Sequence, residues 1–492
     1  MTFWLLLLLG LITYTILQRS VSRITRTPVW LLWLVMMTPA LVLSAWAAIA
    51  GDDGSVPAFV AIAIFAICFS LYLWLLYWGR PKPNSPPATP SNSSNSPTAT
   101  AVSEPSERQS LVSKLRPIAP AEESRLRNCF NWSVFALQNL EYLPQAVVCR
   151  GQLRTNPDRA YQTIRRNVEQ QFGDRFLVVL QEGPNRKPLF VLAPNPKAKT
   201  ASLEPIRRPG LAWALWVVTL FTTTVAGAQF MGVATETWQS EPNLLLRGLP
   251  YSLSLLAILA FHEGGHFLAA RWHRLKTTLP YFIPVPFFLG TFGAFVQIRS
   301  PMPHRKALFD VSVTGPLVGF LLTLPLLWWG LAHSEVVPAS EQSGLLNFDE
   351  LQPSFSLLLS LICKAVLEGS LDPQKAIDLH PVAISGYLGL ILTAFNLMPI
   401  GQLDGGHMVH AMFGRRTASA IGQVTRLLML MLALIHPELF LWTLLLFLMP
   451  LRDEPALNDL TELDNARDFL GLVCLFLLAV VILPAPRMLL GG

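Results

Sequence analysis

Long apolar runs separated by short polar segments occupy most of this sequence. The runs that we interpret as membrane spans lie near residues 3–18, 28–50, 57–79, 209–233, 248–272, 308–333, 381–398, 418–435 and 467–484. A helix of about 20 apolar residues crosses the hydrocarbon core of a bilayer, which is about 30 Å thick. The run at 353–369 fits a short span or an interfacial or re-entrant helix, and the run at 437–451 fits a partial or tilted span. The pattern therefore predicts a polytopic α-helical membrane protein with about 8–10 spans.

Two stretches between the first and second sets of runs follow a different pattern. Residues 80–118 are rich in Pro, Ser, Thr and Asn and hold few bulky apolar side chains, so we predict a disordered linker there. Residues 119–205 contain a predicted helix with Asn156 as its N-cap, Pro157 at its first position and Gly173 at its end. Two apolar stretches on either side of GPNRK predict a β-hairpin. We interpret this stretch as a small α+β soluble domain with a basic surface.

Composition and charge exclude an ordinary soluble protein and orient the spans. Of the 492 residues, 52% are hydrophobic and 14% are charged, whereas soluble domains carry about 25% charged residues. Basic loops alternate with acidic or neutral loops from span to span, as expected when Lys and Arg mark the cytoplasmic side. The net charge of +6 is therefore no sign of nucleic-acid binding. The alternation places the α+β domain and the C-terminal end of the 248–272 helix on the cytoplasmic side.

One apolar run ends in the sequence HEGGH, which places three ionisable side chains within a span. His262 and His266 are one helical turn apart and project from the same face. Two imidazoles in this spacing can bind zinc, and Glu263 can reach a water molecule beside the ion. Ionisable residues within a membrane are costly and usually functional. The alternative is a pair of helix-end histidines that reach toward the interface beside Arg271 and Arg274.

A catalytic zinc site needs a third protein ligand and an open position. The best candidate is Asp404 in the sequence NLMPIGQLDGGHMVH, because it follows an apolar span and begins a new helical pattern. A carboxylate at that depth needs a partner, which a divalent cation supplies. The alternative for Asp404 is a helix N-cap. We expect the nearby His407 and His410 to be polar-face or supporting residues and not ligands.

HEGGH followed by NLMPIGQLDGG resembles the site-2 protease family of intramembrane zinc metalloproteases. The stretch GTFGAFVQI (290–298) is similar to a glycine-containing hairpin that lies between these motifs in the family. The sequence HPVAISGYLGLILTAFNLMPIGQLDGGH (380–407) resembles the branch found in cyanobacteria and chloroplasts, as do the long N-terminal region and the stretch around CRGQLRTNP (149–157), although the resemblance is weaker over 119–205. No PDZ-like domain lies between the motifs. The strong resemblance covers residues 209–485.

The resemblance implies roles for five residues. His262, His266 and Asp404 would bind one zinc ion per chain. Glu263 would deprotonate the attacking water and pass the proton to the leaving amide nitrogen. Asn396 would hydrogen-bond to the scissile carbonyl or to its oxyanion, and its alternative is an amide that caps a loop.

The same resemblance implies the function. It is that of a zinc-dependent intramembrane endopeptidase, a metalloprotease that cleaves transmembrane segments of single-span membrane proteins and so carries out regulated intramembrane proteolysis. The lipid bilayer is the other partner, and no nucleic acid is expected. We place the chain as a multi-pass protein of a bacterial, cyanobacterial plasma or thylakoid membrane, with the active-site opening on the cytoplasmic side. The predicted domains are N-terminal spans (1–79), the linker (80–118), the cytoplasmic α+β domain (119–205) and the intramembrane metalloprotease domain (206–492).

Two other classes of function remain open. Intramembrane His, Glu and Asp side chains also serve transporters and proton pathways, although no inverted repeat is evident in the sequence. A catalytically silent membrane scaffold is the second alternative, and the intact Glu263 argues against it.

The segment 280–301 cannot form one straight helix. It carries prolines and glycines at short intervals, namely Pro280, Pro284, Pro286, Gly290 and Gly293. Irregular backbone at membrane depth is tolerated where it is buried in protein or lines a wet cavity. We predict a strand edge that holds an extended substrate; the alternative is an interfacial loop without substrate contact.

The adjacent glycines of HEGGH raise a separate question. Each costs about 1 kcal/mol relative to alanine in a helix. Without side chains, Gly264 and Gly265 leave room beside the site either for close helix packing or for the substrate backbone.

Overall fold

The computed structural model describes most of the chain from residue 120 onward and a smaller part before it. The described residues are 14, 28–50, 68, 71, 75, 118, 120–143, 146–183, 186–195, 209–233, 241–286, 289–338, 348, 351–367, 375–435, 439–451 and 453–486. The spans predicted near 3–18 and 57–79 and the linker at 80–118 lie outside the described residues, apart from isolated positions. The chain divides into two units, Met1–Val102 and Ser103–Gly492.

The first unit contains helix α2 (Val29–Ala50), which coincides with the apolar run predicted near 28–50. Its 22 residues carry no charged side chain. Leu32 and Val35 on this helix form a small apolar cluster with Leu75.

The second unit begins with the α+β region, whose helix and strands follow from the signals in its sequence. Its elements are α5 (Glu123–Cys129), β1 (Phe135–Leu143), β2 (Ala146–Leu153), α6 (Pro157–Phe172), β3 (Phe176–Glu182) and β4 (Pro188–Pro194). The antiparallel sheet has the strand order β1-β2-β4-β3, so β1 and β3 are its edges. Asn156 caps α6 by accepting a hydrogen bond from the backbone N–H of Asp158 (2.9 Å), and Gly173 ends the helix with φ +60°. The predicted hairpin is confirmed as the β3–β4 pair.

The remainder of the second unit is a bundle of apolar helices. Its helices are α8 (Pro209–Phe230), α10 (Leu249–Trp272), α11 (Arg305–Ala332), α12 (Leu357–Val366), α13 (Pro381–Leu397), α14 (Asp404–Phe413), α15 (Arg415–Ile435), α16 (Phe440–Leu448) and α17 (Asn465–Ile482). Within the described ranges, five of them (α8, α10, α11, α15 and α17) are long and apolar enough to cross a membrane. The chain is thus a multi-pass membrane protein. Helix α13, expected as a span, has 17 residues and a length of about 26 Å.

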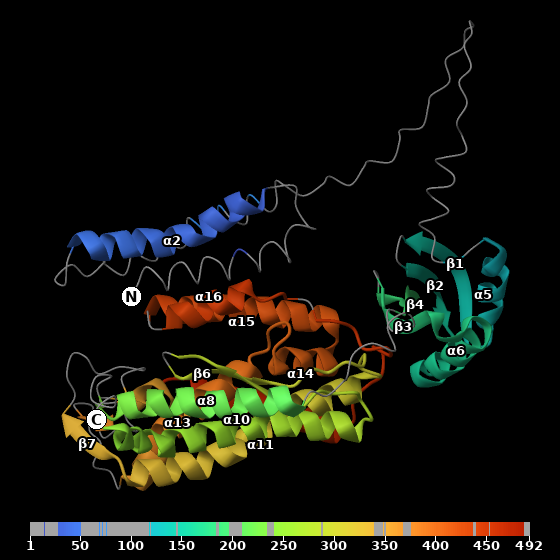
Figure 1. Cartoon of the computed structure of the whole chain (residues 1–492). Coiled ribbons are helices and arrows are strands. Elements are labelled where there is room, and N and C mark those ends of the chain that lie inside the picture. The colour runs from blue at the N-terminus through green and yellow to red at the C-terminus, as the bar shows by residue number, and fades with distance from the viewer. Residues whose placement is uncertain are drawn as a thin grey trace, which may run out of the picture. The chain divides into compact units, whose positions relative to one another are not determined.

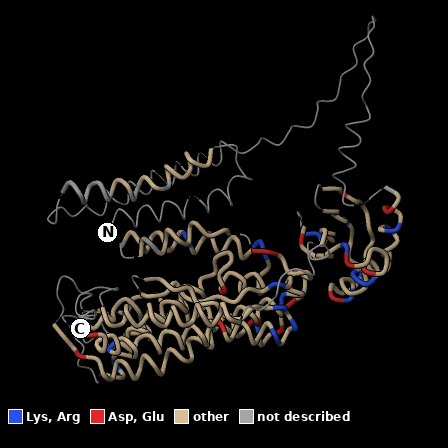
Figure 2. The backbone as a smooth tube through the Cα atoms, viewed as in Figure 1, with Lys and Arg blue, Asp and Glu red and all other residues tan. Residues whose placement is uncertain are grey.

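Helices α8, α10, α11 and α13 run side by side in the bundle (Figure 1). Hydroxyl pairs join them, because Thr223 Oγ1 of α8 lies 2.5 Å from Ser252 Oγ of α10, and Ser385 of α13 donates to Ser254 of α10 (2.6 Å). Such buried contacts between small polar side chains hold helices together where the surroundings are apolar. Charged residues gather at one end of this bundle and in the α+β region, whereas the middle of the bundle carries few (Figure 2).

A short hairpin interrupts the helices between α10 and α11. Strands β5 (Tyr281–Pro284) and β6 (Thr291–Phe295) pair antiparallel, which confirms that this segment is not a straight helix. Thr222 Oγ1 of α8 donates to the carbonyl oxygen of Gly290 (2.7 Å) and so holds the end of the hairpin loop against that helix. A second pair, β7 (Glu335–Pro338) and β8 (Lys375–Asp378), follows α11.

Candidate metal centre

Helix α10 presents the HEGGH sequence to the interior of the bundle. The side chains of His262 and Glu263 are buried and that of His266 is nearly so. Because His262 and His266 are one turn apart, their imidazoles lie on one face, and their Nε2 atoms are 3.3 Å apart. The helical spacing predicted for the pair is confirmed.

Asp404, the first residue of α14, completes the group. Its Oδ2 atom lies 3.6 Å from His262 Nε2 and 3.3 Å from His266 Nε2. The cap position of α14 is Leu403, and no side chain caps the helix. The Asp404 carboxylate therefore faces the imidazoles and does not act as the N-cap. The structure brings together all three residues that the sequence predicts as ligands, and their role as zinc ligands remains a prediction.

The three donor atoms fit a metal ion. Two imidazole nitrogens and one carboxylate oxygen, each about 2.0–2.2 Å from a tetrahedral zinc ion, lie about 3.3–3.6 Å from one another. The separations of 3.3, 3.3 and 3.6 Å match this requirement. Among the described residues, His262, His266 and Asp404 form the group of His, Cys, Asp or Glu side chains whose donor atoms lie close enough together to share one ion. Three protein ligands would leave the fourth position of a tetrahedral zinc ion open.

Backbone and amide groups orient the imidazoles. His266 Nδ1 donates to the carbonyl oxygen of Val311 on α11 (2.8 Å). This bond fixes the tautomer in which the Nε2 lone pair of His266 faces Asp404. The Nδ2 atom of Asn396, near the end of α13, lies 3.3 Å from His262 Nε2. Asn396 thus points to the site and does not cap a loop.

Glu263 connects the site to the hairpin. Its carboxyl group lies against the backbone of Val296, the residue that follows β6. The possible base therefore lies beside the strand that was predicted to hold the substrate. Sequence reasoning missed the contacts of Val296 and Val311, because both residues act through backbone groups that any residue type carries.

The two glycines of HEGGH have different surroundings. A Cβ atom on Gly265 would lie 2.7 Å from the carbonyl oxygen of Thr314, so this glycine allows α10 and α11 to approach closely. A Cβ atom on Gly264 would meet nothing within 4 Å. On α11, a Cβ atom on Gly315 would lie 2.2 Å from His266 Nε2, so Gly315 leaves the space that the imidazole fills. Helix packing thus accounts for Gly265, whereas Gly264 borders open space.

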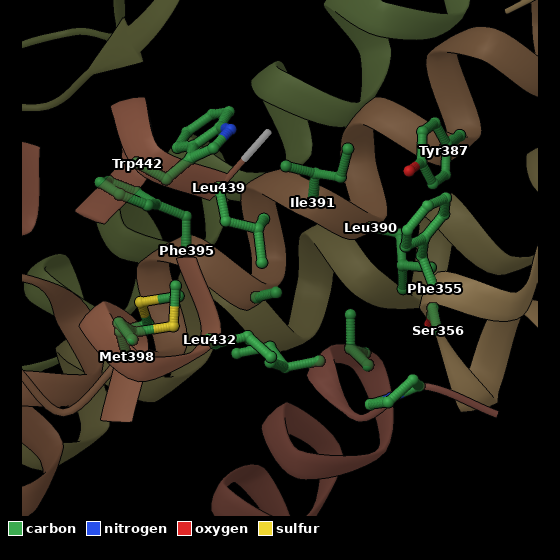
Figure 3. Close-up of a pocket in the computed structure, with 15 residues that line it drawn as sticks. Phe355, Ser356, Tyr387, Leu390, Ile391, Phe395, Met398, Leu432, Leu439 and Trp442 are labelled. Carbon is green, nitrogen blue, oxygen red and sulfur yellow. The ribbon is translucent and has the colours of Figure 1, made fainter. Parts of the chain in front are cut away.

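A separate apolar cavity lies on another side of α13. Side chains from α13, α15 and α16 converge on it, including Phe395, Leu432 and Trp442 (Figure 3). The ring centroids of Phe395 and Trp442 lie 5.3 Å apart, and the two ring planes are tilted by 58°. None of the three predicted metal ligands lines it. Its lining is apolar apart from the hydroxyl-bearing side chains of Ser356 and Tyr387.

The contrast between the two glycines can be tested by substitution. Gly265→Ala forces α10 away from α11, and such overpacking costs about 1–3 kcal/mol of stability. Gly264→Ala has room for its methyl group and gains up to about 1 kcal/mol from helix propensity. Thermal unfolding in detergent is expected to show a lower midpoint for Gly265→Ala and a midpoint for Gly264→Ala no lower than wild type. Equal midpoints for the two variants would contradict the packing role of Gly265.

Two family models match this chain. Residues 250–435 match the model described as peptidase family M50, and residues 124–200 match the model described as the EGY3 middle domain. No solved structure matches.

Similar proteins come from plants. One is the "Probable zinc metalloprotease EGY1, chloroplastic" of Oryza sativa subsp. japonica, which is 30% identical over 376 residues that cover 70% of this chain and 63% of the relative. The EGY1 protein of Arabidopsis thaliana is 28% identical, with coverages of 75% and 72%. The "Probable zinc metalloprotease EGY2, chloroplastic" of Arabidopsis thaliana is 31% identical, with coverages of 73% and 63%. The alignment therefore spans less than two thirds of the rice EGY1 and Arabidopsis EGY2 proteins.

Proposed function

Because this chain belongs to peptidase family M50, we propose that it is a zinc-dependent endopeptidase that cleaves membrane proteins within the bilayer. The observation that carries the proposal is the meeting of His262, His266 and Asp404 beside the buried carboxyl group of Glu263. The relatives are named as zinc metalloproteases, and the donor atoms here have the spacing that one zinc ion requires. One zinc ion per chain is the cofactor that we propose.

Each of the residues around the site has a separate role in peptide hydrolysis. A zinc ion held by His262, His266 and Asp404 would act as a Lewis acid. Glu263 accepts a proton from the attacking water and returns it to the leaving amide nitrogen. The backbone of Val296 lies against the Glu263 carboxyl group and orients it for this transfer. Asn396, which lies beside His262, donates a hydrogen bond to the oxygen of the scissile carbonyl as negative charge develops there.

The hairpin supplies a place for an extended substrate. A transmembrane helix has to unwind before cleavage, because its carbonyl groups are already hydrogen-bonded within the helix. Strand β6 leads to Val296 beside Glu263, and Phe292 on this strand is 71% exposed. A substrate strand that pairs with the hairpin would bring its backbone to the possible base. We therefore propose substrates with a single transmembrane segment that unwinds beside β6.

The orientation in the membrane is part of the same proposal. The alternation of basic and acidic loops supports a cytoplasmic position for the α+β region and for the site opening. The relatives are named as chloroplastic, which agrees with a thylakoid or plasma membrane of a cyanobacterium. Single-span membrane proteins and the bilayer are the partners that we propose.

Substitution of the possible base tests the reaction. Glu263→Gln keeps the size of the side chain and removes its ability to accept a proton, so cleavage is expected to fall by about 10²–10⁴-fold. Zinc content is expected to stay at one ion per chain. Cleavage of a single-span substrate in detergent, together with elemental analysis, measures both. Glu335→Gln, at an exposed residue of β7, is the control. Cleavage by the Glu263→Gln variant at the wild-type rate would refute the role of Glu263.

A proline at the hairpin tests the substrate site. Val296→Pro removes the backbone N–H beside the Glu263 carboxyl group and disrupts the strand edge. We expect cleavage to fall at least about tenfold with zinc content unchanged. Val296→Ala keeps the N–H and is expected to cleave as wild type does. Unchanged turnover of the Val296→Pro variant would argue that the hairpin is an interfacial loop without substrate contact.

A further inference from the structure

A buried cluster of charged side chains lies near the C-terminal end of α14. The imidazole of His410 is fully buried, with Nδ1 2.7 Å from Asp453 Oδ2 and Nε2 2.9 Å from Asp459 Oδ1. Carboxylate oxygens only accept, so both ring nitrogens donate and the imidazole is held protonated. Arg305 Nε lies 3.4 Å from Asp459, and His407 Nδ1 lies 2.8 Å from Asp453. His410, expected as a polar-face residue, is thus the centre of a buried ion cluster.

The carboxylates of this cluster belong to the segment between α16 and α17. Although burial raises the pKa of Asp453, the adjacent imidazoles of His407 and His410 lower that pKa overall, so Asp453 stays ionised. A buried ion pair is strongly destabilised when one partner is removed, because the other charge is left without compensation. The contacts of Asp453 and Asp459 therefore hold residues 453–461, which we call the linking segment, firmly against α14.

The linking segment also joins the sheet of the α+β region. The Leu180 N–H donates to the Leu457 carbonyl oxygen (2.7 Å), and the Asp459 N–H donates to the Leu180 carbonyl oxygen (2.8 Å). These bonds form a parallel bridge between Leu180 and Asn458. Because β3 is an edge of the sheet, the linking segment extends the sheet beyond that edge. Leu457 and Leu460 pack against the apolar core of the α+β region.

Side chains make a second attachment to α6. Asn458 Nδ2 donates to Asp158 Oδ1 (2.7 Å), and Thr461 Oγ1 donates to the same oxygen (2.8 Å). Asp158 lies in the first turn of α6. One short segment is thus bound on one side to β3 and α6 and on the other to α14.

Helix α14 connects the linking segment to the candidate metal centre. It has ten residues, begins with Asp404 and carries His410 on its second turn. A single short helix moves as a rigid unit, so a shift of His410 displaces the Asp404 carboxylate from the two imidazoles. Groups that orient a ligand in this way commonly change metal affinity by about 10–100-fold when they are removed.

We propose that His410 is a positioning residue for Asp404, and that the linking segment makes the metal affinity of the site depend on attachment of the α+β region. This inference rests on the proposed metal site. The attachment regulates how firmly the third ligand is held and takes no part in the reaction itself.

The rate of metal release tests whether the attachment of the α+β region through the linking segment affects the metal site, which we call the link. This measurement does not depend on catalysis. The full-length chain in detergent is loaded with Co²⁺, and the visible absorption of the bound ion is followed after a chelator is added. Asp158→Ala removes the carboxylate oxygen on α6 that accepts the hydrogen bonds of Asn458 and Thr461. We expect release about fivefold faster than from wild type and a changed visible spectrum. For His410→Ala we expect a larger effect, about 10–100-fold in affinity.

Two further variants separate the link from a general loss of structure. Asp158→Asn keeps the Oδ1 acceptor and is expected to restore the wild-type rate and spectrum. Thr461→Val removes the hydroxyl group of the linking segment that donates to Asp158. We expect it to release Co²⁺ faster than wild type, as Asp158→Ala does. Glu169→Ala, at the opposite end of the same helix, is the matched control, because Glu169 pairs with Arg165 at the surface.

The outcomes distinguish this inference from the proposed function. A wild-type chain that binds no Co²⁺ would overturn the metal site and the link together. A wild-type chain that binds Co²⁺, with release from Asp158→Ala and Thr461→Val as slow as from Glu169→Ala, would overturn the link alone. Faster release from both variants, restored in Asp158→Asn, supports it.

Discussion

The structure depends on the burial of one carboxylate, Asp404, against two imidazoles inside an apolar bundle. An ionised carboxylate that loses its water is costly unless an opposite charge compensates it. A divalent cation held by Asp404, His262 and His266 would supply that charge at the point where the three donor atoms converge. The packing of the bundle serves this convergence, because Gly265 and Gly315 let α10 and α11 approach while leaving space for the His266 ring.

The short helix α14 joins two charged clusters of different kinds. At its beginning, Asp404 faces the possible metal ligands, and farther along His410 binds two carboxylates of the linking segment. In the first cluster the donor atoms have the spacing that one metal ion requires, whereas in the second the charges compensate one another within the protein. The linking segment also extends the sheet at β3. Through this segment, helix α14 connects the candidate metal centre of the bundle to the sheet of the α+β region.

Local signals in the sequence were enough to predict several features of the fold and of the candidate site. The spacing of His262 and His266 follows from helical periodicity, and the cap and end of α6 follow from Asn156 and Gly173. The contacts of His410 with Asp453 and Asp459 could not be predicted, because their partners meet only in the packed bundle. The sequence left two readings of Asp404, since an acid at the start of a helix fits an N-cap as well as a metal ligand; the direction of its carboxylate distinguishes them. The same limit applied to Gly264 and Gly265, whose surroundings differ although their residue type is the same.

The central claim is that His262, His266 and Asp404 hold one zinc ion. X-ray absorption at the zinc edge of the purified chain tests it most directly, because it reports the type and distance of the atoms bound to the metal. We expect two imidazole nitrogens and light oxygen donors at about 2.0–2.2 Å, with one zinc ion per chain. A spectrum without imidazole scattering, or one dominated by sulfur at about 2.3 Å, would contradict the account.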